Sequence, residues 1–230
     1  MTQTEFIANF CRNNLNLRNA KLGNEYYYQS LPLCIIDALF SIGIKYQTTQ
    51  SVVQKYCNFF KLNRIRKNIK DVPIKEEQQA ISEFLNLEDK YDFTNKVFDN
   101  RNRTSAQNGI LKSEAVFLFA KVLNKYGIDY FQDMPKLYSN YLYISEEIMQ
   151  IPGQRSGISL KYFLMLAGND NLIKPDRQIL SFLKSILNEN VSIQDAQALL
   201  EQSCEILKKE YPNLNLRLLD HLIWNYQRSI

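Results

Sequence analysis

The sequence predicts an all-α fold with little or no sheet. Apolar residues recur at helical spacing in many separate stretches, and no long alternation of Val, Ile and Thr with polar residues occurs. Hydrophobic residues make up 45% of the 230 residues, which is enough to build a sizeable core. We therefore expect a helical protein of one large domain or two small lobes.

Three helices are expected in the first part of the chain. The first spans Thr4 to Leu17, and the second begins near Pro32, a residue that suits the first turn of a helix, and runs to Gly43. The third is amphipathic, with an apolar stripe of Val52, Val53, Tyr56 and Phe60.

The middle of the chain alternates between basic, helical and polar segments. Lys75 to Leu85 is expected to form a helix, with acidic residues favourably placed in its first turn. A second helix is expected from Leu111 to Tyr126, and Pro135 to Tyr143 is expected to be a connector. Five basic residues precede these elements within ten positions: Lys61, Arg64, Arg66, Lys67 and Lys70. They could contact phosphates or form a solvated helix end.

The stretch from Ile151 to Ile179 contains the most informative pattern. Pro152 and Gly153 end a short helix, and a second helix with a wide apolar face is expected from Ser156 to Ala167. A short polar loop follows, and Asp176 then opens a third helix.

Two further helices are expected to complete the chain. One begins near Ser192, whose spacing to Asp195 resembles a capping box, and continues to Tyr211. The last is expected to span Leu216 to Tyr226.

The pattern from Ile151 to Asp176 resembles the helix–hairpin–helix DNA glycosylase superfamily, which includes the relatives of endonuclease III and alkyladenine glycosylase. Pro152-Gly153, the apolar helix and Asp176 stand in the order and at the separation of that family. The resemblance implies a single glycosylase-like domain over residues 1–230. One lobe would combine residues 1–30 with 175–230, the other would hold residues 31–174, and DNA would bind in the cleft between them.

The resemblance implies that Asp176 is the catalytic residue. Enzymes of this kind rotate the target nucleotide out of the base stack before they cleave it. Breaking the N-glycosidic bond builds positive charge on the sugar, which a carboxylate stabilises while it orients the attacking water. The alternative is that Asp176 only caps its helix, because Asp is favoured at that position in any protein.

The resemblance also implies DNA contacts in two places. Backbone amides and a helix N-terminus suit a phosphate, so the hairpin residues Gly153, Gln154, Arg155, Ser156 and Gly157 are expected to bind the DNA backbone. Gln47 and Thr49 match a Gln-x-Thr pattern of the family, whose glutamine enters the space left by the flipped base. The alternative for this second site is helix capping by Thr48 or Thr49.

The hairpin departs from the family pattern at two positions. Arg155 stands where the second hairpin glycine is usual, and Gly157 stands where bifunctional members carry a lysine nucleophile. The resemblance therefore implies a monofunctional glycosylase of base excision repair, without a lyase step. A catalytically inactive helix–hairpin–helix DNA-binding module is the alternative function, and a helical protein-interaction domain without DNA affinity is a third.

Composition limits the cofactors and the compartment. The four cysteines, Cys11, Cys34, Cys57 and Cys204, match no zinc or iron–sulfur spacing, so we expect buried thiols and neither a metal nor another cofactor. No apolar run is long enough to cross a membrane, and the N-terminus lacks the features of a signal peptide. A net charge of +4 permits nucleic-acid binding. The expectation is a cytoplasmic, nucleoid-associated monomer whose partner is double-stranded DNA with a damaged or modified base.

Overall fold

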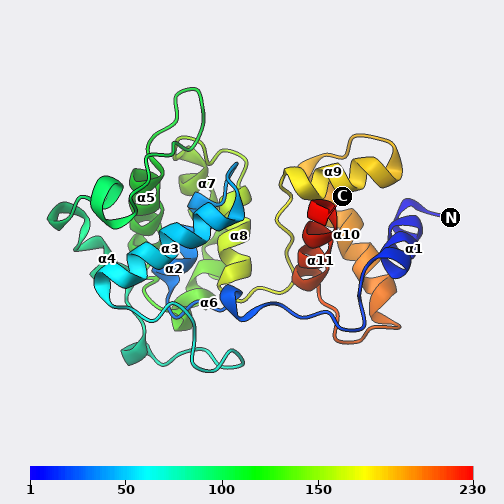
Figure 1. The fold of residues 1–230 in the computed structure, drawn as a ribbon, viewed down its shortest axis with the longest axis horizontal. Coiled ribbons are helices and arrows are strands. Elements are labelled where there is room, and N and C mark those ends of the chain that lie inside the picture. The colour runs from blue at the N-terminus through cyan, green and yellow to red at the C-terminus, as the bar shows by residue number, and fades with distance from the viewer. Residues whose placement is uncertain (230) are drawn as a thin grey trace. The chain divides into compact units, whose positions relative to one another are not determined.

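The computed structural model describes residues 1–229, and its regular structure is helical (Figure 1). No β-strand occurs within this range, and the antiparallel pairings there are two isolated bridges, Tyr28–Ile65 and Arg103–Leu111. The predicted all-α fold is therefore confirmed. Across the same residues, no helix combines the length and the apolar composition that a membrane span requires.

The chain divides into two compact units. Unit 1 combines Met1–Gly23 with the described residues from Gly168 onward, and unit 2 is the continuous segment Asn24–Ala167. The sequence placed the corresponding boundaries after residues 30 and 174, so the observed boundaries lie earlier in the chain at both places.

Unit 1 contains four helices: α1 (Gln3–Asn14), α9 (Arg177–Leu187), α10 (Ile193–Lys208) and α11 (Leu216–Ser229). α1 packs against α10 and α11 packs against α9. The hydrophobic core draws on all four helices, and its members include Ile7, Cys11, Ile179, Phe182, Leu200, Cys204, Leu219 and Ile223. The capping interaction predicted at Ser192 is confirmed, because its hydroxyl accepts a hydrogen bond from Asp195 N at 3.0 Å.

Polar contacts join the two ends of the chain inside unit 1. Arg12 on α1 forms a bidentate ion pair with Glu210: Nε donates to Oε2 at 3.2 Å and Nη2 donates to Oε1 at 2.7 Å. The Ser203 hydroxyl on α10 donates to the Thr4 carbonyl at 3.1 Å. Unit 1 thus depends on residues that are almost 200 positions apart in the sequence.

Unit 2 is built around α2 (Leu31–Phe40), in which every residue is buried. A helix that is buried on all sides needs neighbours on all sides. α2 accordingly contacts α3 (Tyr46–Phe60), α5 (Lys112–Lys125) and α8 (Ile158–Leu166). The remaining elements are η1 (Asn24–Tyr26), η2 (Lys75–Glu77), α4 (Ile81–Leu85), η3 (Glu88–Lys90), the π-helical η4 (Phe93–Val97), η5 (Phe131–Asp133), α6 (Met134–Ser139) and α7 (Tyr141–Gln150).

The helix predicted from Lys75 to Leu85 is wrong. The structure has η2 and α4 there, separated by residues 78–80, and Gln78 is extended with φ −103° and ψ 149°. The buried Gln78 side chain donates to the Pro73 carbonyl at 2.6 Å and accepts from Phe131 N at 3.1 Å. These hydrogen bonds hold the backbone out of a helical conformation, because tertiary contacts override local propensity.

The connector predicted from Pro135 to Tyr143 is also wrong, because α6 and α7 cover it with a single break at Asn140. Pro135 does not prevent the helix, since proline is tolerated in a first turn. The predicted burial of the cysteines is confirmed: Cys11, Cys34, Cys57 and Cys204 are buried thiols without a disulfide.

Candidate functional site

The predicted hairpin lies between α7 and α8 in unit 2. Its first turn closes with a hydrogen bond from Gln154 N to the Ile151 carbonyl at 2.9 Å, and its second with one from Gly157 N to the Gln154 carbonyl at 2.9 Å. Pro152 and Gly153 occupy the centre of the first turn, and Gly153 has a φ of +85°. Proline followed by a residue with positive φ is typical of a type II turn.

Two constraints favour glycine at position 153: the positive φ of the backbone and the close approach of Thr104. A Cβ atom at this position would lie 2.5 Å from Thr104 Cβ and 2.6 Å from Thr104 Oγ1. Thr104 is itself fixed, because its N donates to the Ile110 carbonyl at 2.9 Å and its hydroxyl accepts from Ile110 N at 3.2 Å. The hairpin therefore packs directly on the loop before α5, and a larger residue would push the two apart.

The N-terminus of α8 is not capped by a side chain. Its N-cap is Gly157, with a φ of +69°, and the nearest polar side chain contact is a long one from Ile158 N to the Ser156 hydroxyl at 3.4 Å. Arg155 and Ser156 are exposed. The first turn of α8 thus has no side-chain cap, and two exposed polar side chains directly precede it.

Gln154 differs from its neighbours in the hairpin. Its residue is only 1% exposed, and neither polar atom of its side-chain amide has a hydrogen-bond partner. The predicted phosphate contact at Gln154 could therefore involve only its main chain. A buried amide without partners is destabilising, which distinguishes this side chain from those that merely fill the core.

The second predicted DNA site belongs to the first turn of α3. The helix begins at Tyr46, so Gln47 and Thr49 lie inside it and not in a turn before it. Gln47 is exposed, whereas Thr49 is 1% exposed and its hydroxyl has no partner. The N-cap is Lys45 and no side chain caps the helix, so the alternative of capping by Thr48 or Thr49 is wrong.

The basic run after α3 is partly structural. The Arg66 guanidinium lies 4.4 Å from the centre of the Phe131 ring, and its Nε donates to the Tyr28 carbonyl at 2.8 Å. Lys67 forms an ion pair with Glu77 at 3.0 Å. Two of the five basic residues, Arg66 and Lys67, therefore make contacts within unit 2 itself.

Asp176 is the N-cap of α9 in unit 1. Its Oδ1 accepts from Gln178 N at 2.9 Å and from Ile179 N at 3.4 Å. Its Oδ2 lies 3.8 Å from Lys174 Nζ, and 24% of the side chain is exposed. The predicted cap is therefore present, and the carboxylate is reachable from solvent.

Asp220, on α11, is a second carboxylate near Asp176. It is 8% exposed, and its Oδ1 accepts from Lys174 N at 2.9 Å. Burial raises the pKa of Asp220 to about 8, and the charge of Asp176 contributes to the rise, while Lys174 and Arg217 oppose it. Asp220 is therefore largely protonated at neutral pH.

Asp220 is a site residue that the sequence did not predict. In a helix it falls outside the stripe formed by Leu218, Leu222, Tyr226, Leu219 and Ile223, so helical periodicity places this acid toward the polar side. Its burial depends on the distant segment that contains Lys174, which no local pattern reveals.

A buried carboxylate also lies inside unit 2. Asp37 on α2 is fully buried, its Oδ2 accepts from the Tyr28 hydroxyl at 2.8 Å, and the Tyr162 hydroxyl lies 3.5 Å from the same oxygen. Burial, with the nearby Asp37 as a second cause, raises the pKa of Tyr28 and of Tyr162 well above the usual range. Both phenols therefore stay protonated and act as donors.

Two lysines of unit 2 have unusual surroundings. Lys112 is 1% exposed, and its Nζ donates to the carbonyls of Phe40 at 3.0 Å and Ile42 at 2.6 Å. Lys161 on α8 is partly buried, and this burial lowers its pKa. Lys112 thus ties α5 to the end of α2, while Lys161 is a partly desolvated amine.

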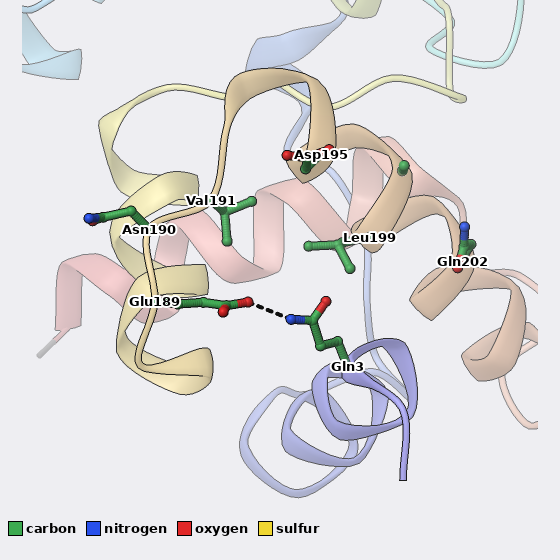
Figure 2. Close-up of a pocket in the computed structure, with 8 residues that line it drawn as sticks. Gln3, Glu189, Asn190, Val191, Asp195, Leu199 and Gln202 are labelled. Atoms are coloured by element: carbon green, nitrogen blue, oxygen red, sulfur yellow. Dashed lines mark hydrogen bonds between the residues drawn. The ribbon is translucent and has the colours of Figure 1, made fainter.

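A separate hollow of about 230 Å³ lies in unit 1. Figure 2 shows the Gln3 side chain directed at the carboxylate of Glu189, to which it donates a hydrogen bond. The lining residues are Gln3, Glu189, Asn190, Val191, Asp195, Ala198, Leu199 and Gln202. None of the predicted site residues lines this hollow.

A family model described as "Domain of unknown function (DUF8548)" matches residues 5–228. The chain belongs to the DUF8548 family. The matched range includes the hairpin, Asp176 and Asp220, so these residues belong to the DUF8548 domain itself. No curated protein matches the chain, and no solved structure matches it.

Proposed function

We propose that this DUF8548 protein is a DNA glycosylase that removes a damaged or mispaired base by hydrolysis of the N-glycosidic bond, as a step of base excision repair. The observation that carries the proposal is the separation of two tasks at Asp176. Oδ1 caps α9, while Oδ2 is turned toward Lys174 and the side chain remains partly exposed. One carboxylate can therefore cap its helix and still present an oxygen to a substrate.

The proposed reaction needs one negative charge and one water molecule. The bond between C1′ of the deoxyribose and the base nitrogen breaks, and the base departs with the bonding electrons. Asp176 stabilises the positive charge that develops on the sugar, and it orients a water molecule whose oxygen then bonds to C1′. The water loses one proton as it bonds to C1′, and the departing base nitrogen takes up one proton, so the products are the neutral base and an abasic site.

The hairpin supports the proposal as a contact for the DNA backbone. The α8 N-terminus lacks a side-chain cap, and Arg155 is exposed beside it. Helix N-termini bind phosphates through amides that have no intrahelical partner, and an arginine adds a charged contact. On α3, the exposed Gln47 is the side chain proposed to enter the space left by the flipped base.

The absence of a lyase step is part of the proposal. By the resemblance to the glycosylase superfamily, Gly157 stands where bifunctional members carry the lysine nucleophile, and the Lys112 amine already donates hydrogen bonds to two carbonyl groups. Lys161 is the lysine to test, because its lowered pKa makes a neutral amine more accessible. Borohydride trapping on a damaged duplex should give no covalent complex. A trapped complex that disappears in Lys161→Met would overturn the monofunctional assignment.

The central experiment is a panel of duplexes carrying uracil, 8-oxoguanine, alkylated purines or mismatches, incubated with the protein and then treated with or without alkali. We expect strand breaks only after alkali. Asp176→Asn retains a good N-cap but loses the charge, so base release should fall by about 10²-fold or more while folding is unchanged. Asp195→Asn, a matched change in the first turn of α10, should leave base release unaffected.

A catalytically inactive DNA-binding module is the second candidate. The observation in its favour is that both oxygens of Asp176 already have partners, two amides for Oδ1 and Lys174 for Oδ2. Salt-dependent binding to duplexes without base release from any of them would favour this module over the enzyme. For either function we propose a monomer that acts on chromosomal DNA in the cytoplasm.

A further inference from the structure

Asp220 reaches across unit 1 to the backbone that leads into Asp176. Its Oδ1 accepts from Lys174 N at 2.9 Å. The carbonyl of the same Lys174 accepts from Asp176 N at 2.6 Å, across the intervening Pro175. A hydrogen bond between residues two apart defines a three-residue turn, and proline fixes φ at its centre. Asp220 therefore holds the first residue of a turn whose last residue is Asp176.

The segment before this turn is also held from outside. On α10, Gln197 accepts from Ile173 N at 3.3 Å and donates to the Asn171 carbonyl at 3.3 Å. On α11, Arg217 N donates to the Asp170 carbonyl at 3.1 Å. Residues 170–174 thus take these hydrogen bonds from neighbouring helices, and Asp220 supplies the one nearest to Asp176.

We propose that Asp220 is a positioning residue, which fixes the Lys174-Pro175-Asp176 turn and so sets the direction in which Asp176 presents Oδ2. The catalytic consequence rests on the proposed function, whereas the positioning itself does not. Asp220 touches no reacting atom in this scheme, and it acts only through the turn.

The charge state of Asp220 fits this role. The charged groups that face it are Lys174 and Asp176 from the turn and Arg217 from its own helix, and Arg217 Nη1 in turn lies 3.4 Å from Asp170 Oδ1. Burial raises the pKa of Asp220 to about 8, so at neutral pH it does not compete with Asp176 for Lys174. Above that pH, Asp220 ionises and repels the Asp176 carboxylate. A displacement of about 1 Å can reduce a rate by about 10²-fold.

The test follows the pH dependence of the Asp176 carboxyl signal in protein labelled with ¹³C at aspartate carboxyl groups, with that signal assigned from Asp176→Asn. In the wild type we expect an inflection of this signal near pH 8, caused by the ionisation of Asp220. Asp220→Asn keeps the acceptor for Lys174 N and removes the charge, so the inflection near pH 8 should disappear. The matched control Asp195→Asn should retain it.

Base release gives the catalytic readout. Asp220→Asn should stay within about twofold of the wild type at pH 7, and it should lack the decline that the wild type shows above about pH 8. Asp220→Leu removes the acceptor, so kcat should fall at least about tenfold while the Kd for DNA is unchanged. If Asp220→Leu does not fold, the comparison with Asp220→Asn decides alone.

The outcomes separate the two proposals. The same pH dependence of the Asp176 signal near pH 8 in the wild type and in Asp220→Asn would overturn the positioning role. An inflection near pH 8 that depends on Asp220, in a protein that releases no base from any duplex, would support the positioning role and overturn the proposed function.

Discussion

The N-termini of α8 and α9 differ in how their first amide groups are capped. Each helix begins with amide groups that have no partner inside the helix. At α9, the Asp176 carboxylate accepts from two of these amides. At α8, the N-cap is Gly157, which has no side chain to offer. One terminus is capped by a carboxylate of the protein itself, and the other has no side-chain cap.

The difference assigns the two termini different uses in the proposed function. An uncapped N-terminus carries partial positive charge and suits a DNA phosphate. A capped one carries a fixed carboxylate, which suits the positive charge that develops on a sugar. The two segments also differ in charge: the Asp176 carboxylate lies near the buried acid Asp220, whereas the hairpin holds Arg155 and no acidic residue.

The largest expected effect is a pH dependence of stability that originates beside α9. The pKa of Asp220 is raised from 3.8 to about 8 in the folded protein. Its contribution to stability is therefore fully present below about pH 4 and declines as the pH rises toward about 8, where it levels off. At pH 7 the difference from a neutral residue is at most about 4 kcal/mol.

Asp220→Asn should accordingly stabilise the protein near pH 7 and flatten the stability profile between about pH 4 and 8. Urea unfolding at several pH values measures this effect. Asp195→Asn serves as the control, because Asp195 is on the surface at the start of α10. A profile of the same slope in Asp220→Asn and the wild type would show that Asp220 is not buried as a neutral acid.

The next largest effect is expected in the hairpin. Gly153→Ala adds a Cβ 2.5 Å from Thr104 Cβ at a φ of +85°, so we expect a loss of about 2–4 kcal/mol and weaker DNA binding. Gly43 has a φ of +67° but nothing within 4 Å of its Cβ position. Gly43→Ala should therefore show the backbone strain alone, about 1 kcal/mol. Equal losses in thermal unfolding would mean that the contact with Thr104 is unimportant.

A smaller effect should separate the two oxygens of Asp176. Asp176→Ala removes the cap and should destabilise the protein by about 1 kcal/mol, whereas Asp176→Asn should be nearly neutral. Both variants should lose base release to a similar extent. Thermal unfolding beside the duplex assay measures both quantities, and activity in Asp176→Asn would show that capping alone, and not charge, is what the reaction needs.

The smallest effect is expected at Arg155. Arg155→Ala should weaken duplex binding and reduce the slope of log K against log salt by about 1, because one phosphate contact is lost. Lys121→Ala removes a positive charge from α5, where Lys121 pairs with Glu88 at 2.7 Å, and should leave the slope unchanged. Titrations of a fluorescent duplex at several salt concentrations give the comparison. An unchanged slope in Arg155→Ala would argue against a phosphate contact at the hairpin.

The sequence predicted the features that short-range signals specify. Pro152-Gly153 marks a turn, and Asp176 at the start of an apolar stripe marks a helix N-terminus, since both signals act within a few residues. The all-helical fold follows from spacing alone. The burial of the four thiols was also predictable from their apolar surroundings.

Features that depend on distant partners were not predictable. Gln78 is not helical because its side chain accepts a hydrogen bond from Phe131 N. Asp220 becomes a site residue because its carboxyl group accepts a hydrogen bond from Lys174 N. The cap proposed for Thr48 or Thr49 is wrong because α3 begins at Tyr46. Both threonines therefore lie inside the first turn of the helix and not at its N-cap. The ends of a helix are harder to predict from sequence than its existence, because helix ends fray and their positions shift by one or two residues.

The construction of unit 1 from both ends of the chain bears on how the nascent protein emerges from the ribosome. The core of unit 2 comes from one continuous segment, so it can assemble as soon as that segment is synthesised. α1 is synthesised before unit 2, yet its partner α10 is synthesised after it. Until α10 is synthesised, the apolar face of α1, with Ile7, Ala8 and Cys11, cannot be buried against its partner helix. We therefore expect chaperones to bind this helix during translation.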